Sequence, residues 1–166
     1  MEGLSKKEIT IVSWLEFYQR YFFSSQDMKR FSKNKAQRYN ITKNLIKKKR
    51  IVKLNRNRYY LVPIKAKSDS WAEHPFIIAD ESCSSENYFI GAWASANYWQ
   101  LTDQIPMQID VFTTRRQGTI KVLNTKIVFH RTTKKRIKNS EIRKIGVHTF
   151  RIENKTDSKA WLKSRN

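Results

Sequence analysis

The sequence has 166 residues, which is long enough for one domain with a sizeable core or for two small ones. Lys and Arg number 34 against 14 Asp and Glu, and the resulting formal net charge of +20 favours polyanionic partners. Hydrophobic residues make up 39% of the chain, which excludes a disordered basic tail, and the single cysteine excludes an intramolecular disulfide. The most apolar stretch, residues 88–101, is too short to span a bilayer, so we expect a soluble, cytoplasmic protein.

Charged residues divide the chain into three zones. Residues 1–63 hold 16 basic and 4 acidic residues, residues 64–112 hold 2 and 7, and residues 113–166 hold 16 and 3. The polar stretch 63–70 lies between two patterned regions, which is typical of a linker. We therefore predict an α+β protein with an N-terminal domain at residues 1–63 and a small mixed α+β domain at residues 70–166.

The N-terminal domain is predicted to contain three helices. The first covers residues 6–23, because apolar side chains recur there at helical spacing: Ile11, Trp14, Leu15, Tyr18 and Phe22. A short second helix begins after the N-cap candidates Ser24 and Ser25 and ends near Phe31. Residues 32–34 form a turn, and the third helix covers residues 35–49.

Two short β-like runs follow the third helix, at residues 50–54 and 58–62. The loop between them has three residues, and Asn57 can take the left-handed conformation that such loops need. Three helices and a hairpin, with a tight turn before the third helix, form the outline of a winged helix-turn-helix.

The third helix separates its side chains into two faces. One face is expected to pack inward, with Arg38 turned towards it, and carries Tyr39, Thr42, Leu45 and Ile46. The opposite face is polar and basic, includes the small Ala36, and carries Gln37, Asn40, Lys43, Asn44 and Lys47. The hairpin adds three cations beside this face: Lys53, Arg56 and Arg58.

This polar and basic face has the residue types that read DNA. Amide side chains bond bidentately to adenine, so Gln37, Asn40 and Asn44 are the candidate base readers. The lysines and hairpin cations are the candidate phosphate contacts. An ordinary solvated helix is the alternative, but such helices mix charges of both signs. Between residues 26 and 61 the only acidic residue is Asp27, against thirteen Lys or Arg, which favours DNA contact.

The second domain is expected to mix helices and strands. A helix or turn is predicted at residues 71–80, a helix at residues 88–101, and a strand at residues 109–113, since Pro106 prevents a helix from continuing. Three further strands are predicted, the first two forming a hairpin, at residues 119–123, 126–130 and 147–152.

Three features could carry other chemistry. Asp110, Glu153 and Lys155 match the carboxylates and lysine of a metal-dependent endonuclease, which would bind Mg²⁺ and activate water. The three histidines are scattered without metal-ligand spacing, and His130 is interpreted as an edge or half-buried structural residue. Cys83 is interpreted as a plain cysteine in a polar loop.

One segment resembles the hallmark of the AbiEi family of abortive-infection antitoxins and related transcriptional regulators. An aromatic-rich helix runs into a Gly-Leu-Thr-x-Gln-x-Pro-like stretch, here Tyr98-Trp99-Gln100-Leu101-Thr102-Asp103-Gln104-Ile105-Pro106. A strand closed by threonines and arginines then follows, Val111-Phe112-Thr113-Thr114-Arg115-Arg116. Residues 45–54 and 58–63 are similar to that family's winged-helix end.

The resemblance implies a two-part protein of a type IV toxin-antitoxin system. Its winged helix would bind operator DNA and repress its own operon, and its second domain would counteract a nucleotidyltransferase toxin. Three positions where the family commonly has glycine hold other residues, Lys49, Asn57 and Gln100, and Lys49 suggests that the helix continues. The chain ends before the further helical part of family members, so we interpret it as a shortened member or a fragment.

We therefore predict a sequence-specific transcriptional repressor of double-stranded DNA, not an enzyme, with no cofactor or metal. Arg115 and Arg116 begin the second basic zone and form a possible second basic patch, which would extend the DNA contact or face the toxin. The alternatives are the endonuclease described above and a non-enzymatic module that binds RNA or protein.

Overall fold

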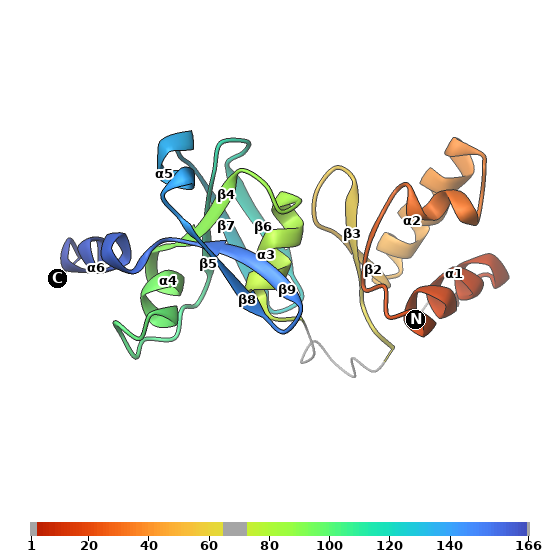
Figure 1. The fold of residues 1–166 in the computed structure, drawn as a ribbon. Coiled ribbons are helices and arrows are strands. Elements are labelled where there is room, and N and C mark those ends of the chain that lie inside the picture. The colour runs from red at the N-terminus through yellow and green to blue at the C-terminus, as the bar shows by residue number, and fades with distance from the viewer. Residues whose placement is uncertain (1–2, 65–72, 166) are drawn as a thin grey trace. The chain divides into compact units, whose positions relative to one another are not determined.

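The computed structural model describes residues 3–64 and 73–165, and within them the protein is a mixed α+β structure with two sheets. The chain divides into two compact units, residues 1–71 and 72–166 (Figure 1). We call them the N-terminal unit and the C-terminal unit and describe each by itself. The linker predicted at residues 63–70 lies largely outside the described residues.

The N-terminal unit places helices around a three-stranded antiparallel sheet with the order β1-β3-β2. Its elements in chain order are α1 (Lys6–Phe17), β1 (Phe22–Ser24), the 3₁₀ helix η1 (Asp27–Arg30), α2 (Lys35–Lys47), β2 (Ile51–Lys53) and β3 (Arg58–Leu61). The core between helices and sheet is built from Ile11, Leu15, Phe23, Met28, Leu45, Ile51 and Leu61. The predicted second helix is confirmed as a single 3₁₀ turn, and both predicted strands are confirmed in shorter form.

The first helix is shorter than its periodicity predicted. It begins with a capping box, in which Ser5 and Glu8 bond each other's backbone amides, and it ends at Phe17. The prediction that it reaches residue 23 is wrong, because Phe22–Ser24 pairs with β3 instead. Phe22 and Phe23 therefore pack as strand residues, although their spacing continues that of the helix.

The C-terminal unit is built on a six-stranded mixed sheet with the order β6-β7-β5-β4-β9-β8. Its strands are β4 (Tyr88–Gly91), β5 (Ile109–Thr113), β6 (Gly118–Val122), β7 (Thr125–Arg131), β8 (Glu141–Ile145) and β9 (His148–Ile152). Its helices are α3 (Pro75–Cys83), α4 (Ala92–Tyr98), α5 (Lys134–Lys138) and α6 (Lys155–Lys163). On one face of the sheet α3 packs against β9 (Figure 1). The rings of Phe76 and Phe150 lie 5.2 Å apart in this contact.

The strand predicted at residues 109–113 is confirmed, and the strands predicted near residues 119, 126 and 147 lie within one or two residues of the expected bounds. The helix predicted at residues 88–101 is wrong in its first part. Tyr88–Gly91 is a fully buried strand between β5 and β9, and only Ala92–Tyr98 is helical. The helix or turn predicted at residues 71–80 begins at Pro75, and residues 71 and 72 lie outside the described residues.

Cys83 is not a loop residue, as its polar neighbours suggested, but the buried last residue of α3. Burial raises the pKa of its thiol to about 12, so the nucleophilic thiolate is not formed near neutral pH. In the part of the chain that the structure describes, no helix has the length and apolar character needed to cross a membrane.

Four helices end in the same way, with a non-glycine residue in the left-handed conformation. These residues are Gln19, Lys49, Ser84 and Gln100, with φ between 52° and 57°. The amide of each donates to the carbonyl three residues earlier, and the next amide donates to the carbonyl five residues before it, at 2.8 to 3.1 Å. This is the Schellman pattern, which usually employs glycine. The expectation that α2 continues through Lys49 is therefore wrong.

Candidate functional site

The start of α2 is fixed by two side chains. Asn34 is the N-cap, and its Oδ1 accepts hydrogen bonds from the amides of Ala36 (2.9 Å) and Gln37 (3.2 Å). The guanidinium of Arg38 donates to the carbonyls of Ser32 (2.9 Å) and Lys33 (2.7 Å), which closes the preceding turn. These contacts orient α2 relative to η1, with Arg38 on the inner side as predicted.

The inner face of α2 differs in part from the predicted one. Ile41, Thr42 and Leu45 are buried, which confirms Thr42 and Leu45. Tyr39 and Ile46 were expected to pack inward, but 67% and 37% of their surface is exposed. The helix is turned so that Ile41 and Leu45, four residues apart, contact the core, and Tyr39 moves to the outer side.

The outer face of α2 carries every residue that the sequence assigned to DNA contact there. All five side chains are exposed, Gln37, Asn40, Lys43, Asn44 and Lys47, and α2 contains no acidic residue. We use "α2 outer face" for these five residues together with Tyr39. Sequence reasoning missed Tyr39, whose four-residue spacing from Lys43 was the available signal.

Gln37 has a structural role that restricts its use as a base reader. The hydroxyl of Ser32 donates to its Oε1 at 2.6 Å, which occupies one of the two lone pairs of that oxygen and ties the side chain to the turn before α2. A bidentate contact to adenine needs both the oxygen and the nitrogen. Asn40 and Asn44 are therefore the better candidates on this face.

The loop between β2 and β3 is organised by Asn55. Its Oδ1 accepts from the amides of Asn57 (2.9 Å) and Arg58 (3.0 Å), so Asn57 does not need the left-handed conformation and does not adopt it. The carbonyl of Asn57 accepts from the amide of Ser25 at 3.2 Å, which holds the loop against the start of η1. Of the predicted hairpin cations, Lys53 and Arg56 are exposed and Arg58 is half-buried.

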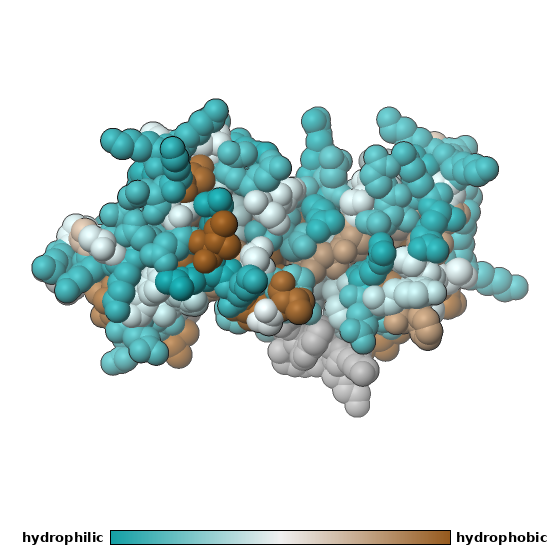
Figure 2. All heavy atoms as spheres, viewed as in Figure 1, coloured by the Kyte–Doolittle hydropathy of each residue, from teal (hydrophilic) through white to brown (hydrophobic). Residues whose placement is uncertain are grey.

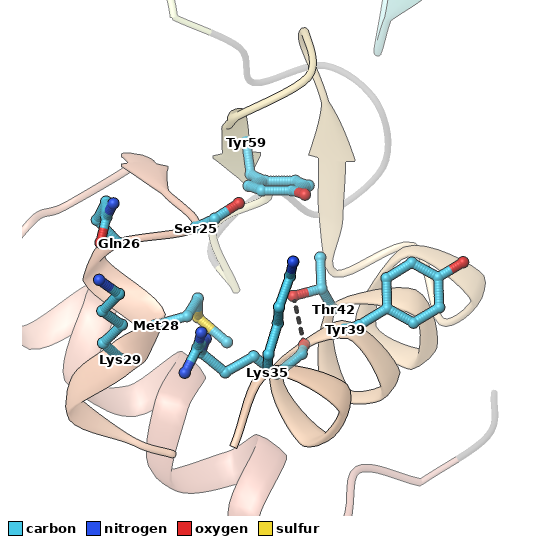
Figure 3. A pocket seen from close by; sticks show the side chains of 9 residues that line it. Ser25, Gln26, Met28, Lys29, Lys35, Tyr39, Thr42 and Tyr59 are labelled. Carbon is cyan, nitrogen blue, oxygen red and sulfur yellow. Dashed lines mark hydrogen bonds between the residues drawn. The ribbon is translucent and has the colours of Figure 1, made fainter. Parts of the chain in front are cut away.

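A hollow of about 220 Å³ lies beside the first half of α2 (Figure 3). Met28 of η1 and Tyr59 of β3 contribute its apolar lining, and the Thr42 hydroxyl that borders it donates to the carbonyl of Arg38 at 2.9 Å. Lys29 and Lys35 line the hollow from η1 and α2. Both lysines are exposed, and sequence reasoning did not assign either of them to a site.

The acidic residues that the structure describes in the N-terminal unit pair with basic residues that do not belong to the α2 outer face. Glu8 pairs with Lys48 at 2.7 Å, Glu16 lies 3.8 Å from Arg50, and Asp27 lies 3.3 Å from Arg20. Burial alone would raise the pKa of Glu8, but hydrogen bonds from Lys48 and Ser5 outweigh it and lower the pKa. The basic partners of these three carboxylates all lie outside α2.

The two arginines of the possible second basic patch, Arg115 and Arg116, contact other residues of the C-terminal unit. Arg115 pairs with Glu86 at 2.6 Å. The guanidinium of Arg116 lies 3.5 Å from the ring centre of Phe129 and donates to the carbonyl of Ser82 at 3.4 Å. Burial lowers the pKa of Arg116. This arrangement gives Arg116 a packing role on the sheet.

The residues of the endonuclease hypothesis are brought only partly together. Asp110 of β5 pairs with Gly91 of β4, and Glu153 directly follows β9, where its amide donates to the carbonyl of Ile90 of β4; both carboxyls are buried. Each has a basic partner, since Asp110 contacts His130 at 2.7 Å and Glu153 contacts Arg136 at 2.9 Å. Within residues 3–64 and 73–165, no group of three or more His, Cys, Asp or Glu side chains could hold a metal ion.

Buried Glu153 is the centre of a polar network. Burial raises its pKa, and the adjacent Arg136 and Ser95 oppose that change. Ser158 of α6 donates to the hydroxyl of Ser95 at 3.0 Å, and the indole of Trp99 donates to the carbonyl of Glu153 at 2.8 Å. The network links α4, α5 and α6 to the end of β9. His130 is half-buried on β7, as the sequence predicted.

Comparison with known proteins adds no family to these observations. No protein-family model matches the chain, and no curated protein is similar to it at a significant level.

Proposed function

We propose that the protein is a sequence-specific DNA-binding transcriptional repressor, with the N-terminal unit acting as a winged helix-turn-helix. The α2 outer face would enter the major groove, and the β2–β3 loop would contact the phosphate backbone. The observation that carries the proposal is this outer face, which joins exposed amides to exposed lysines without any acidic residue.

The order of the elements supports the winged helix. A helix, a strand, a short helix, a turn and a second helix lead into a hairpin, and the first strand pairs with the last one. The hairpin therefore closes a sheet with β1, and its loop is bonded to the start of η1 through Ser25 and Asn57. This connection holds the loop beside the segment that leads through η1 into α2, which suits two elements that contact one duplex.

The distribution of polar residues supports DNA as the partner. Figure 2 shows mainly hydrophilic residues over the part of the view where α2 and the β2–β3 loop lie in Figure 1. Lys43 and Lys47 on α2, and Lys53 and Arg56 on the hairpin, are exposed cations that suit phosphates. Asn40 and Asn44 lie on the same face and suit base edges.

The test is a fluorescence-anisotropy titration at about 150 mM salt, where non-specific attraction is reduced. The duplex from upstream of the protein's own gene is compared with a scrambled duplex of equal length and composition. A preference of about a thousandfold or more is expected for a specific regulator. Equal and weak binding of both duplexes would contradict the proposal.

The antitoxin role that the AbiEi resemblance implies is a second candidate. It is favoured by an exposed loop within the resembling segment, where 81% of the surface of Ile105 and 93% of that of Met107 is exposed. Exposed apolar side chains of this size suit a protein partner. Binding to the toxin encoded in the same operon should weaken in the double variant Ile105→Ser and Met107→Ser. DNA binding should be unchanged, and unaltered toxin binding would remove this loop from the interface.

A further inference from the structure

The C-terminal unit contains a pocket of about 350 Å³ that the DNA-binding proposal does not use. This volume lies within the range of pockets that hold small molecules. Strands β5 and β7 line it from the sheet, and α4, α5 and α6 line it from the other elements. The residues that give it chemical character are Trp93, Asp110, His130, Arg136, Trp161 and Arg165.

Aromatic rings line much of the pocket. Trp93 and Trp161 meet edge to face with ring centres 5.3 Å apart, and both are half-buried. On the sheet, the ring of His130 stacks on that of Phe112 at 5.0 Å. Phe112 lies against Gly91, where a Cβ would meet its ring at 2.8 Å, so this ring takes the place of a side chain at position 91. These surfaces suit a flat aromatic group.

Two arginines supply positive charge at the pocket. Arg136 lies over the rings of Phe89 and Phe112, 5.4 Å from each, and pairs with Glu153 through one of its nitrogens. Arg165 lies 5.5 Å from the ring centre of Trp161 and forms no side-chain hydrogen bond or ion pair with the described residues. Arginine donors in this arrangement suit a phosphate group, which accepts several hydrogen bonds at once.

Asp110 provides a buried acceptor in the same pocket. The side chains of Gln108 (3.0 Å) and His130 (2.7 Å) both donate to its Oδ1. Because a carboxylate can only accept, Nε2 of His130 is the donor in this contact. No donor among the described residues contacts Oδ2, which is left for an amino group of a bound molecule. An anion alone would be repelled by this carboxylate, whereas a base that carries an amino group would be held by it.

We propose that this pocket binds a nucleotide, with its base against the tryptophan rings, its amino group on Asp110 and its phosphate on Arg165 and Arg136. The nucleotide is either free or part of a single RNA strand, since both present the same chemistry. The proposal concerns the C-terminal unit alone and does not rest on DNA binding by α2.

Isothermal titration calorimetry at about 150 mM salt tests the proposal on the full chain. The probes are AMP, CMP, GMP and UMP, with ribose 5-phosphate and cytidine as partial ligands, and trinucleotide RNAs as the strand form. Trp161→Leu and Arg165→Gln remove one ring and one exposed cation. Arg143→Gln is the matched control, because Arg143 also lies over a tryptophan, 4.7 Å from the ring centre of Trp99. Lys43→Ala with Lys47→Ala controls for binding at the α2 outer face.

The expected result is binding of AMP or CMP that is tighter than that of UMP, which has no amino group. Trp161→Leu and Arg165→Gln should each weaken it by about tenfold, the size of a single stacking or charge contact. The control variants should leave it unchanged. If the trinucleotides bind and the mononucleotides do not, and the Trp161 and Arg165 variants weaken that binding in the same way, the ligand is a nucleotide within a single RNA strand. Absence of binding in both forms, or equal effects of Arg143→Gln and Arg165→Gln, would overturn the proposal.

Discussion

Replacing Lys43 and Lys47 by alanine should reduce the salt dependence of DNA binding by a calculable amount. Six exposed cations border the proposed DNA surface: Lys29, Lys35, Lys43, Lys47, Lys53 and Arg56. If each meets one phosphate, the slope of log affinity against log salt is about −5.4, and the double variant has a slope of about −3.6. Between about 100 and 300 mM salt, the affinity then falls about 400-fold for the native protein and about 50-fold for the variant.

The assay is an anisotropy titration of one duplex at five salt concentrations, with the slope as the result. A second double variant, Lys7→Ala with Lys144→Ala, removes two exposed lysines that belong to neither α2 nor the hairpin and serves as the control for net charge. The reasoning is refuted if both double variants change the slope equally, or if the Lys43 and Lys47 variant leaves it unchanged. Either result would mean that DNA contacts another surface.

Three further predictions concern single residues. Asn40→Ala should cost about 1–3 kcal/mol at a cognate site and leave scrambled DNA unaffected, and a uniform loss in the same anisotropy assay would mean that Asn40 reads no base. Lys49→Gly should raise the free energy of unfolding by about 0.5–1 kcal/mol in urea denaturation, because glycine adopts the left-handed conformation without strain. A decrease would show that this strain is absent. The Nδ1 of His74 accepts from the amide of Phe76 at 3.2 Å, and burial lowers the pKa of His74. The unfolded state therefore binds the proton more readily, and stability should fall as pH drops below about 6.5. His74→Asn keeps an N-cap acceptor and should flatten that part of the curve of unfolding temperature against pH, whereas an unchanged curve would exclude His74 as its source.

Short-range sequence patterns predicted some strands correctly and failed to predict others. The strand Ile109–Thr113 was predictable because β-branched residues follow a proline that prevents a helix. Tyr88–Gly91 was not, because a strand buried on both faces has a continuous apolar run that periodicity cannot distinguish from a helix. Phe22–Ser24 was missed because its aromatic residues continue the spacing of α1, while the pairing with β3 that decides their state is a tertiary contact.

Three elements gave too little hydrophobic signal to be predicted. The edge strand β8, Glu141–Ile145, buries none of its residues fully, and α5 is a single lysine-rich turn. The helix Lys155–Lys163 buries only Ser158 fully, and that serine is held by the network around Glu153. A polar contact between α4 and α6 has no sequence pattern of its own, so α6 could not be inferred from spacing.

The candidate site was predictable in its polar part. Amides and lysines on one side of α2 are exposed because nothing in the core can satisfy them. The apolar side was ambiguous, since Tyr39, Ile41, Leu45 and Ile46 together cover more of the helix than the core contacts. Which of them is buried depends on β2 and β3, and Tyr39 was therefore assigned to the wrong side. The pocket of the C-terminal unit is lined by residues from five helices and strands, so no local sequence motif predicts it.

The four left-handed helix ends have a consequence for how far this protein could be stabilised. Each of Gln19, Lys49, Ser84 and Gln100 holds a backbone conformation that a Cβ disfavours by about 1 kcal/mol. The four positions lie at the ends of different helices, so glycine replacements there should act nearly independently. Gln19 and Lys49 belong to the N-terminal unit, and Ser84 and Gln100 belong to the C-terminal unit. The replacements would therefore add about 1–2 kcal/mol to each unit, a substantial part of the stability of an ordinary domain. At these four helix ends the backbone thus tolerates a more heat-resistant sequence than the one it carries.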